Sequence, residues 1–191
     1  MAEVNAKPDL DRLADGAKQA PGRGLPPVHL WNPTHAGEID IVIRPDGSWT
    51  HEGAVIGRAA LVRLFSTILR KDEDGYWLVT PVEKMRIKVE DAPFTAVAVE
   101  AARDAEGQAV LRFTTNVGDV TVAGPDNPIR VETDPGTGEP RPYVHVRRGL
   151  EALILRPVFY ELADMAQMRD GVAGVESAGA WFPLEPEAPR P

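Results

Sequence analysis

The chain has 191 residues, 43% of them hydrophobic and 26% charged, which is enough apolar material for one large or two small folded domains. It has no cysteine, which excludes a disulfide framework, thiol catalysis and cysteine-bound metals. The formal net charge of −8 repels nucleic acid at long range, so we do not expect a nucleic-acid-binding protein.

The first 24 residues are expected to form a flexible tail. Leu10, Leu13 and Ala17 have the spacing of one face of a short helix, but prolines and glycines over 21–27 break regular structure. The tail lacks a basic start followed by an apolar run, and no apolar stretch of the chain is long enough to span a membrane. We therefore expect a cytoplasmic protein without a secretory signal.

Residues 25–84 are predicted to form an N-terminal α+β domain. After Glu38 an isoleucine stands at every second position from 39 to 43, and turn residues follow at 45–48, which predicts a hairpin over 38–50. Apolar residues over 57–71 follow the helical period, so a helix is expected there. A short strand is expected at 76–80.

Residues 85–191 are predicted to form a C-terminal, mainly-β domain with one helix. Short candidate strands alternate with turn-like clusters, which favours an antiparallel sheet. A helix is expected at about 157–169 and a last strand at 181–184. The fold class is thus α+β, with antiparallel sheets and few helices. The candidate strands cover residues 86–90, 95–102, 109–115, 119–123, 129–133 and 143–147.

Two stretches of the chain share one pattern. Each contains an aromatic residue two positions before a histidine, then a glycine, then Ile–x–Arg followed by apolar residues at helical spacing. The first stretch begins at Trp49 and contains Arg58, and the second begins at Tyr143 and contains Arg156. The shared order predicts an internal duplication of a strand–helix–strand unit, which cannot bury its helix without a partner sheet.

The two matched arginines are expected at helix starts, where the helix dipole disfavours a cation. One explanation is a structural ion pair, Arg58 with Glu83 and Arg156 with Glu185. The two glutamates stand two residues after Pro81 and Pro183, which are predicted to match in the shared pattern. The other explanation is an anionic ligand, held by the guanidinium and by helix N–H groups. Both stay open at this point.

No catalytic motif is evident. The histidines at 29 and 35 do not have the spacing of a helical metal site, and we expect neither a metal nor a cofactor. His51 and His145 lack a nearby nucleophile-elbow serine, so a hydrolase that uses either of them is a minor hypothesis. No glycine-rich segment has the strand-to-helix context of a phosphate-binding loop.

Several short motifs are spread over about residues 25–184. They are Asp46–Trp49, Gly53, Ile56, Arg58, Leu64–Phe65, Leu78–Lys84, Asp91–Phe94, Tyr143–Arg147, Gly149–Ala152, Arg156, Tyr160 and Leu162. As a set they resemble a bacterial family known as domain of unknown function 1285. The resemblance implies a duplicated core, a C-terminal half loosely like pleckstrin-homology folds, a site for a nucleotide-like ligand at the domain interface, and a role in signalling. It implies no catalytic residues.

We therefore predict a non-enzymatic sensor or adaptor that binds a small anionic, nucleotide-like ligand at the interface of two duplicated domains and acts in signal transduction. The alternative is a protein–protein interaction module without a small-molecule ligand. The predicted ligand-binding residues, chosen from matched motif positions and charge, are Trp49, Arg58, Thr80, Glu83, Lys84, Tyr143, Arg147 and Arg156.

Overall fold

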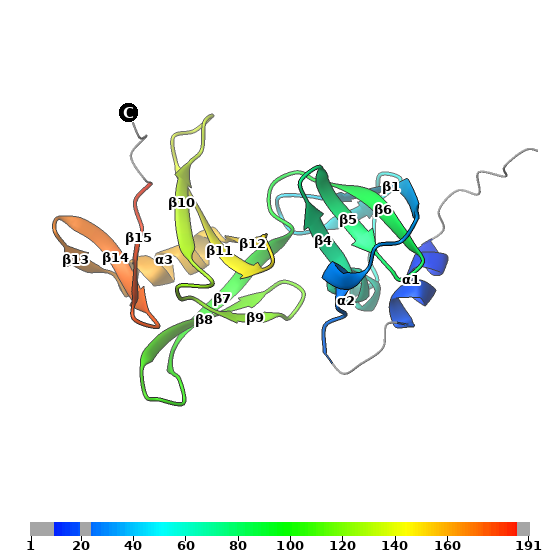
Figure 1. Ribbon diagram of the computed structural model, residues 1–191. Helices are drawn as coiled ribbons and strands as arrows, with labels where there is room; N and C mark the ends of the chain where they lie inside the picture. Colours follow the sequence, from blue (N-terminus) through cyan, green and yellow to red (C-terminus); the bar gives the residue numbers. More distant parts are fainter. Residues whose placement is uncertain (1–9, 20–23, 187–191) are drawn as a thin grey trace, which may run out of the picture. The chain divides into compact units, whose positions relative to one another are not determined.

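The computed structural model describes residues 10–19 and 24–186. The chain divides into two compact units (Figure 1), the first made of residues up to Arg44 together with Ser48–Glu90, and the second of Pro45–Gly47 together with the chain from Asp91 onward. The predicted domain boundary after residue 84 would cut the last strand of the first unit, so the observed boundary lies later, between Glu90 and Asp91.

The first unit contains one six-stranded sheet in the order β3-β2-β1-β6-β5-β4. Its β1 and β6 pair in parallel, whereas its other neighbouring strands are antiparallel. The predicted hairpin is confirmed as β1 and β2. The elements are α1 (Leu10–Lys18), a 3-10 turn η1 (Val28–Leu30), β1 (His35–Ile43), β2 (Trp49–His51), β3 (Ala54–Val55), α2 (Ala59–Thr67), β4 (Leu69–Asp72), β5 (Gly75–Val79) and β6 (Glu83–Val89).

The core of the first unit forms where α2 packs on the sheet. Ile41 and Ile43 of β1 are buried because the period-two pattern places them on one face. On α2, Leu61 and Phe65 are buried, and the Phe65 ring stacks on Trp49 of β2 at 6.5 Å between centroids. The predicted amphipathic stripe of α2 therefore faces the predicted apolar face of the hairpin.

The helix α2 ends at Thr67, earlier than predicted. The hydroxyl groups of Ser66 and Thr67 each donate to a carbonyl three residues earlier, at 2.7 Å, which competes with continuation of the helix. The chain then pairs as β4 with β5, with Leu69 opposite Leu78. Ile68, which caps the helix, and Leu69, which begins β4, are both buried and so continue the apolar period beyond the end of the helix.

Part of the predicted tail is folded. Residues 10–18 form α1, which contacts α2 and buries Leu13, Ala14 and Ala17. Arg12 of α1 also pairs with Glu83 of β6 at 2.7 Å. The expectation of a flexible tail is therefore wrong for this segment, because its apolar face has a surface to cover; residues 1–9 and 20–23 lie outside the described residues.

The second unit contains a six-stranded sheet, β10-β11-β12-β7-β8-β9, and a three-stranded sheet, β13-β14-β15. The first of these also contains one parallel pair, β12 with β7, as the first unit does with β1 and β6, whereas the other neighbouring strands are antiparallel as predicted. The elements are β7 (Phe94–Arg103), β8 (Ala109–Thr115), β9 (Val120–Val122), β10 (Ile129–Thr133), β11 (Pro140–Arg147), β12 (Leu150–Ile154), α3 (Arg156–Asp164), β13 (Gln167–Arg169), β14 (Val172–Ser177) and β15 (Ala180–Pro183).

Helix α3 and the small sheet pack on the large sheet of this unit. Val158 and Leu162 of α3 are buried, and the buried Ser177 hydroxyl accepts from the Leu111 N–H at 2.7 Å and donates to the Ala123 carbonyl at 2.6 Å. The predicted helix over 157–169 is too long, because its last residues form strand β13 instead.

The order of elements repeats between the units. The first runs β1-β2-β3-α2-β4-β5-β6 and the second runs β10-β11-β12-α3-β13-β14-β15, which agrees with the predicted α+β fold and duplication. The predicted match of Pro81 with Pro183 is wrong, because Pro81 follows the second strand after its helix and Pro183 ends the third. The likeness of the C-terminal half to pleckstrin-homology folds is not confirmed and stays a prediction.

Candidate ligand-binding groove in the second unit

A groove with a volume of about 380 Å³ lies in the second unit, lined by the segment that joins β10 to β11 and by the first turn of α3. It is lined by Asp134, Thr137, Glu139, Pro140, Arg141, Pro142, Leu153, Ile154, Leu155, Arg156, Phe159 and Tyr160. Charged side chains and apolar side chains both line it, which is the usual composition of a small-molecule site.

The β10–β11 loop is held by Asp134. One carboxylate oxygen of Asp134 accepts the N–H groups of Gly136 and Thr137, both at 2.9 Å, and the other accepts from Arg141 at 2.8 Å. The Thr137 N–H, the Arg141 guanidinium and the Gly136 N–H hold the pKa of Asp134 below its ordinary value. This wall of the groove is thus ordered and stays anionic.

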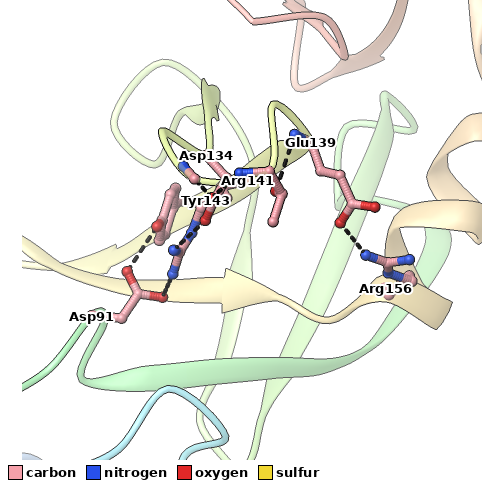
Figure 2. A network of polar contacts seen from close by, with 8 residues as sticks. Asp91, Asp134, Glu139, Arg141, Tyr143 and Arg156 are labelled. Atoms are coloured by element: carbon pink, nitrogen blue, oxygen red, sulfur yellow. Dashed lines mark hydrogen bonds and ion pairs between the residues drawn. The ribbon is translucent and has the colours of Figure 1, made fainter.

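Arg141 belongs to a network of polar contacts (Figure 2). Its guanidinium bridges Asp134 and Asp91, the latter at 2.6 Å, and the Tyr143 hydroxyl donates to the other oxygen of Asp91 at 2.8 Å. Burial lowers the pKa of Arg141, but the hydrogen bonds to the two carboxylates raise it more, so the net direction is upward. The single positive charge of Arg141 is therefore shared by two carboxylates of the protein.

Arg156 lies at the edge of the groove and pairs with Glu139 across it (Figure 2). Both side chains are largely exposed, 64% for Arg156 and 54% for Glu139. The charge of Glu139, together with its hydrogen bond, raises the pKa of Arg156. An exposed ion pair of this kind contributes little to stability, so its partners can exchange.

The apolar part of the groove comes from Pro140, Pro142, Leu155, Phe159 and Tyr160. The Tyr160 side chain is exposed, with 58% of its surface accessible. Large apolar side chains are normally withdrawn from water, and here they lie beside an exchangeable cation. The arrangement suits a ligand with an apolar body and an anionic group.

Five predicted site residues lie in the first unit, and the structure does not assemble them into one site. Trp49 is only 1% exposed, and its indole N–H has no hydrogen-bond partner among the described residues, so it is a core residue that cannot stack on a ligand. Thr80 and Glu83 do come together, because the Glu83 N–H donates to the Thr80 hydroxyl at 3.2 Å. Both are buried under α1 and its Arg12, and they form a structural turn.

The remaining two residues of the first unit point elsewhere. Lys84 lies over the ring of Trp77, 4.3 Å from its centroid, and 3.8 Å from Asp72. Arg58 is exposed and precedes α2 as its N-cap residue. The predicted ion pair of Arg58 with Glu83 is wrong, because Glu83 binds Arg12 instead.

The second unit contains the other three predicted residues. Arg156 lines the groove, and its predicted partner Glu185 is replaced by Glu139. Tyr143 is 4% exposed and supports the groove through Asp91 without lining it. Arg147 lies apart from it, paired with Asp119 and placed over the Phe94 ring at 5.0 Å.

Sequence reasoning missed the groove residues Asp134, Glu139, Arg141 and Phe159, and it missed Asp91, which binds Arg141 behind the groove. A partial signal existed, since Arg141 and Tyr143 alternate on one face of a strand and Asp134 begins a turn-like cluster. The sequence pattern does not reveal that this turn lies beside the start of α3.

His145 is held in its hairpin, where its Nε2 accepts the Gly149 N–H at 3.0 Å and its Nδ1 lies 3.2 Å from the Asn127 amide. Within residues 10–19 and 24–186, no cluster of three or more histidine, aspartate or glutamate side chains is arranged to hold a metal ion. In the same part of the chain, no helix has both the length and the apolar character needed to cross a membrane.

These features define a class, namely an α+β protein with two related units and a groove of small-molecule size in the second. The family model described as domain of unknown function (DUF1285), N-terminal domain, matches residues 26–92. The model described as protein of unknown function (DUF1285), C-terminal domain, matches residues 93–184. The chain therefore belongs to the DUF1285 family, as its motifs predicted.

Two solved structures of that family are similar to this chain. A DUF1285 family protein from Silicibacter pomeroyi DSS-3 is 55% identical with a TM-score of 0.82, over 90% of this chain and 93% of that one. A DUF1285 family protein from Shewanella baltica OS155 is 26% identical with a TM-score of 0.49, over 65% of this chain and 90% of that one. No curated protein matches the chain.

Proposed function

We propose that this protein is a non-enzymatic sensor or adaptor that binds a small organic anion in the groove of its second unit and acts in cytoplasmic signal transduction. The observation that carries the proposal is the exposed Arg156–Glu139 pair at the edge of a groove of about 380 Å³. Ligand cavities in proteins are of this order of size, and they combine apolar walls with a few placed polar groups.

The charges support an anion over a cation. Both oxygens of Asp134 already accept hydrogen bonds from the protein, one from two N–H groups and the other from Arg141, which leaves them little capacity for a ligand cation. Arg156 has Glu139 as its ion-pair partner, and that carboxylate is a single exposed side chain. A ligand anion can take its place at small cost, because the net value of such a pair is about 0–1 kcal/mol.

The test is isothermal titration calorimetry of the full chain against a panel of nucleotides and organic carboxylates. We expect binding by at least one anion, and at least a ten-fold loss of affinity in Arg156→Gln. The matched control is Arg112→Gln, since Arg112 forms a comparably exposed pair with Glu100 at 2.9 Å outside the groove. The proposal is wrong if no panel member binds, or if both variants bind as the unmodified protein does.

A second candidate function is docking of a protein partner at β9. Val120 and Val122 of this short edge strand are 58% and 39% exposed, and they share one face because strand side chains alternate. An exposed edge with apolar side chains is suited to strand addition. Val120→Lys would abolish such docking and leave anion binding in the groove unchanged.

A further inference from the structure

We infer that the ligand of the groove is a singly charged carboxylate with an aromatic or branched apolar body, and that Glu139 occupies the place of its carboxylate in the unliganded protein. This inference rests on the proposed function and narrows it. It departs from the nucleotide-like ligand that the family resemblance implies.

The charge of the walls favours a monoanion. The lining contains two acidic residues, Asp134 and Glu139, and two basic residues, Arg141 and Arg156. Arg141 is bound to Asp91 as well as to Asp134, so it has no charge to spare for a ligand. One cation, Arg156, is therefore exchangeable. A polyphosphate would bring further negative charges against the fixed Asp134 carboxylate, and like charges at close range repel.

The shape and chemistry of the walls favour an apolar body. The groove volume of about 380 Å³ is near the small end of ligand cavities. The walls away from the ion pair are formed by Pro142, Leu155 and Phe159, together with the exposed ring of Tyr160. Such walls offer area for an aromatic or branched apolar group, and Phe159 and Tyr160 add ring faces and edges for aromatic contact.

Glu139 has the properties of an internal competitor. It lies in the β10–β11 connection, directly before Pro140 of β11, and its side chain reaches Arg156 of α3. A carboxylate side chain and a carboxylate ligand present the same two oxygens to a guanidinium. Ligand entry therefore exchanges one carboxylate for another at Arg156, without leaving the cation unpaired.

The experiment measures affinity by calorimetry with two named carboxylate probes, phenylacetate and indole-3-acetate. Phenylacetamide is the uncharged control, and AMP and inorganic phosphate are the competing anions. We expect both carboxylates to bind and phenylacetamide, AMP and phosphate to bind at least ten-fold more weakly. Arg156→Gln weakens carboxylate binding at least ten-fold, whereas Glu139→Gln strengthens it about two- to five-fold, because the competitor loses its charge.

The matched control for Glu139→Gln is Glu100→Gln, which breaks the exposed Arg112–Glu100 pair and leaves affinity unchanged. Thermal melts establish that all variants are folded, as expected for exposed side chains. AMP or phosphate binding as tightly as the carboxylates, with loss in Arg156→Gln, would overturn this inference and leave the proposed function standing. Unchanged or weaker carboxylate binding in Glu139→Gln would overturn the competitor role. Absence of binding by every probe would overturn both proposals.

Discussion

Tyr143→Phe tests whether the polar network behind the groove stabilises the fold. The substitution removes one hydroxyl, which donates to Asp91 at 2.8 Å, and keeps the buried ring. The ring also lies beneath the Arg130 guanidinium at 4.3 Å, a contact that phenylalanine retains. The perturbation is therefore nearly confined to one charge-assisted hydrogen bond.

The expected cost near neutral pH is about 1.5–3 kcal/mol, the range for hydrogen bonds to charged groups. Part of the Asp91 carboxylate stays paired in the variant, because Arg141 still donates to its other oxygen at 2.6 Å. We therefore expect a value near the lower end, about 1.5 kcal/mol, which lowers the melting temperature by about 3–6 °C in a chain of this size.

The Tyr143 hydroxyl also makes the difference in free energy of unfolding between the unmodified protein and Tyr143→Phe depend on pH. Burial and the neighbouring Asp91 carboxylate raise the pKa of Tyr143 from 10.0 to about 12. A raised folded-state pKa means that the protonated form is favoured by folding, so the stabilisation is complete below pH 10 and is lost as the pH rises towards 12. At pH 11 the loss is about 1.4 kcal/mol, the equivalent of one pKa unit.

The assay is urea denaturation of both proteins at pH 8 and pH 11, followed by circular dichroism. The unmodified protein and the variant share all other ionisable groups, so the difference between the free energies of unfolding of the two proteins reports on Tyr143. We expect about 1.5 kcal/mol at pH 8 and a difference close to zero at pH 11. A difference that stays constant between these pH values refutes the reasoning from the buried Tyr143–Asp91 pair.

Two further substitutions test close packing at a glycine and the hydrogen bonds that an arginine side chain makes to the backbone. Gly174→Ala should lower the free energy of unfolding by about 1–3 kcal/mol in urea denaturation, because a Cβ there would overlap the Trp181 ring. Its control is Gly57→Ala, which should change that free energy by less than about 0.5 kcal/mol, because no atom lies within 4 Å of the new carbon. Arg70→Met should cost about 2 kcal/mol or more, because the Arg70 guanidinium donates to two η1-region carbonyls, at 3.0 and 2.8 Å, and to a carboxylate. The exposed Arg63→Met is its control, and equal midpoints for the two arginine variants would contradict this role.

Local pattern predicted much of the fold. The alternation of Ile39, Ile41 and Ile43 predicted β1, because a half-buried strand requires that period. The same reasoning failed at the end of α2, where Ile68 and Leu69 continue the helical period although Ile68 caps the helix and Leu69 begins β4. The parallel pairs, β1 with β6 and β12 with β7, join strands far apart in the sequence, and no local pattern specifies them.

The candidate site was predictable only in part, for a related reason. Charge logic found Arg156, because a cation at a helix start needs a compensating group. The compensating group is Glu139, seventeen residues earlier in a turn, and spacing along the chain does not reveal that approach. Trp49 shows the opposite error, since composition alone cannot separate an aromatic ligand platform from a core side chain that is 1% exposed.

The two copies of the repeated unit differ in what surrounds their matched arginines. Arg58 and Arg156 stand at matching places, directly before α2 and at the first residue of α3. In the second unit the loop between β10 and β11 brings Glu139 to Arg156 and forms a wall of the groove. In the first unit the glutamate expected beside Arg58 is bound to Arg12 of α1. Repetition of elements thus preserved the position of the cation, whereas the surrounding loops determine whether that position lines a groove.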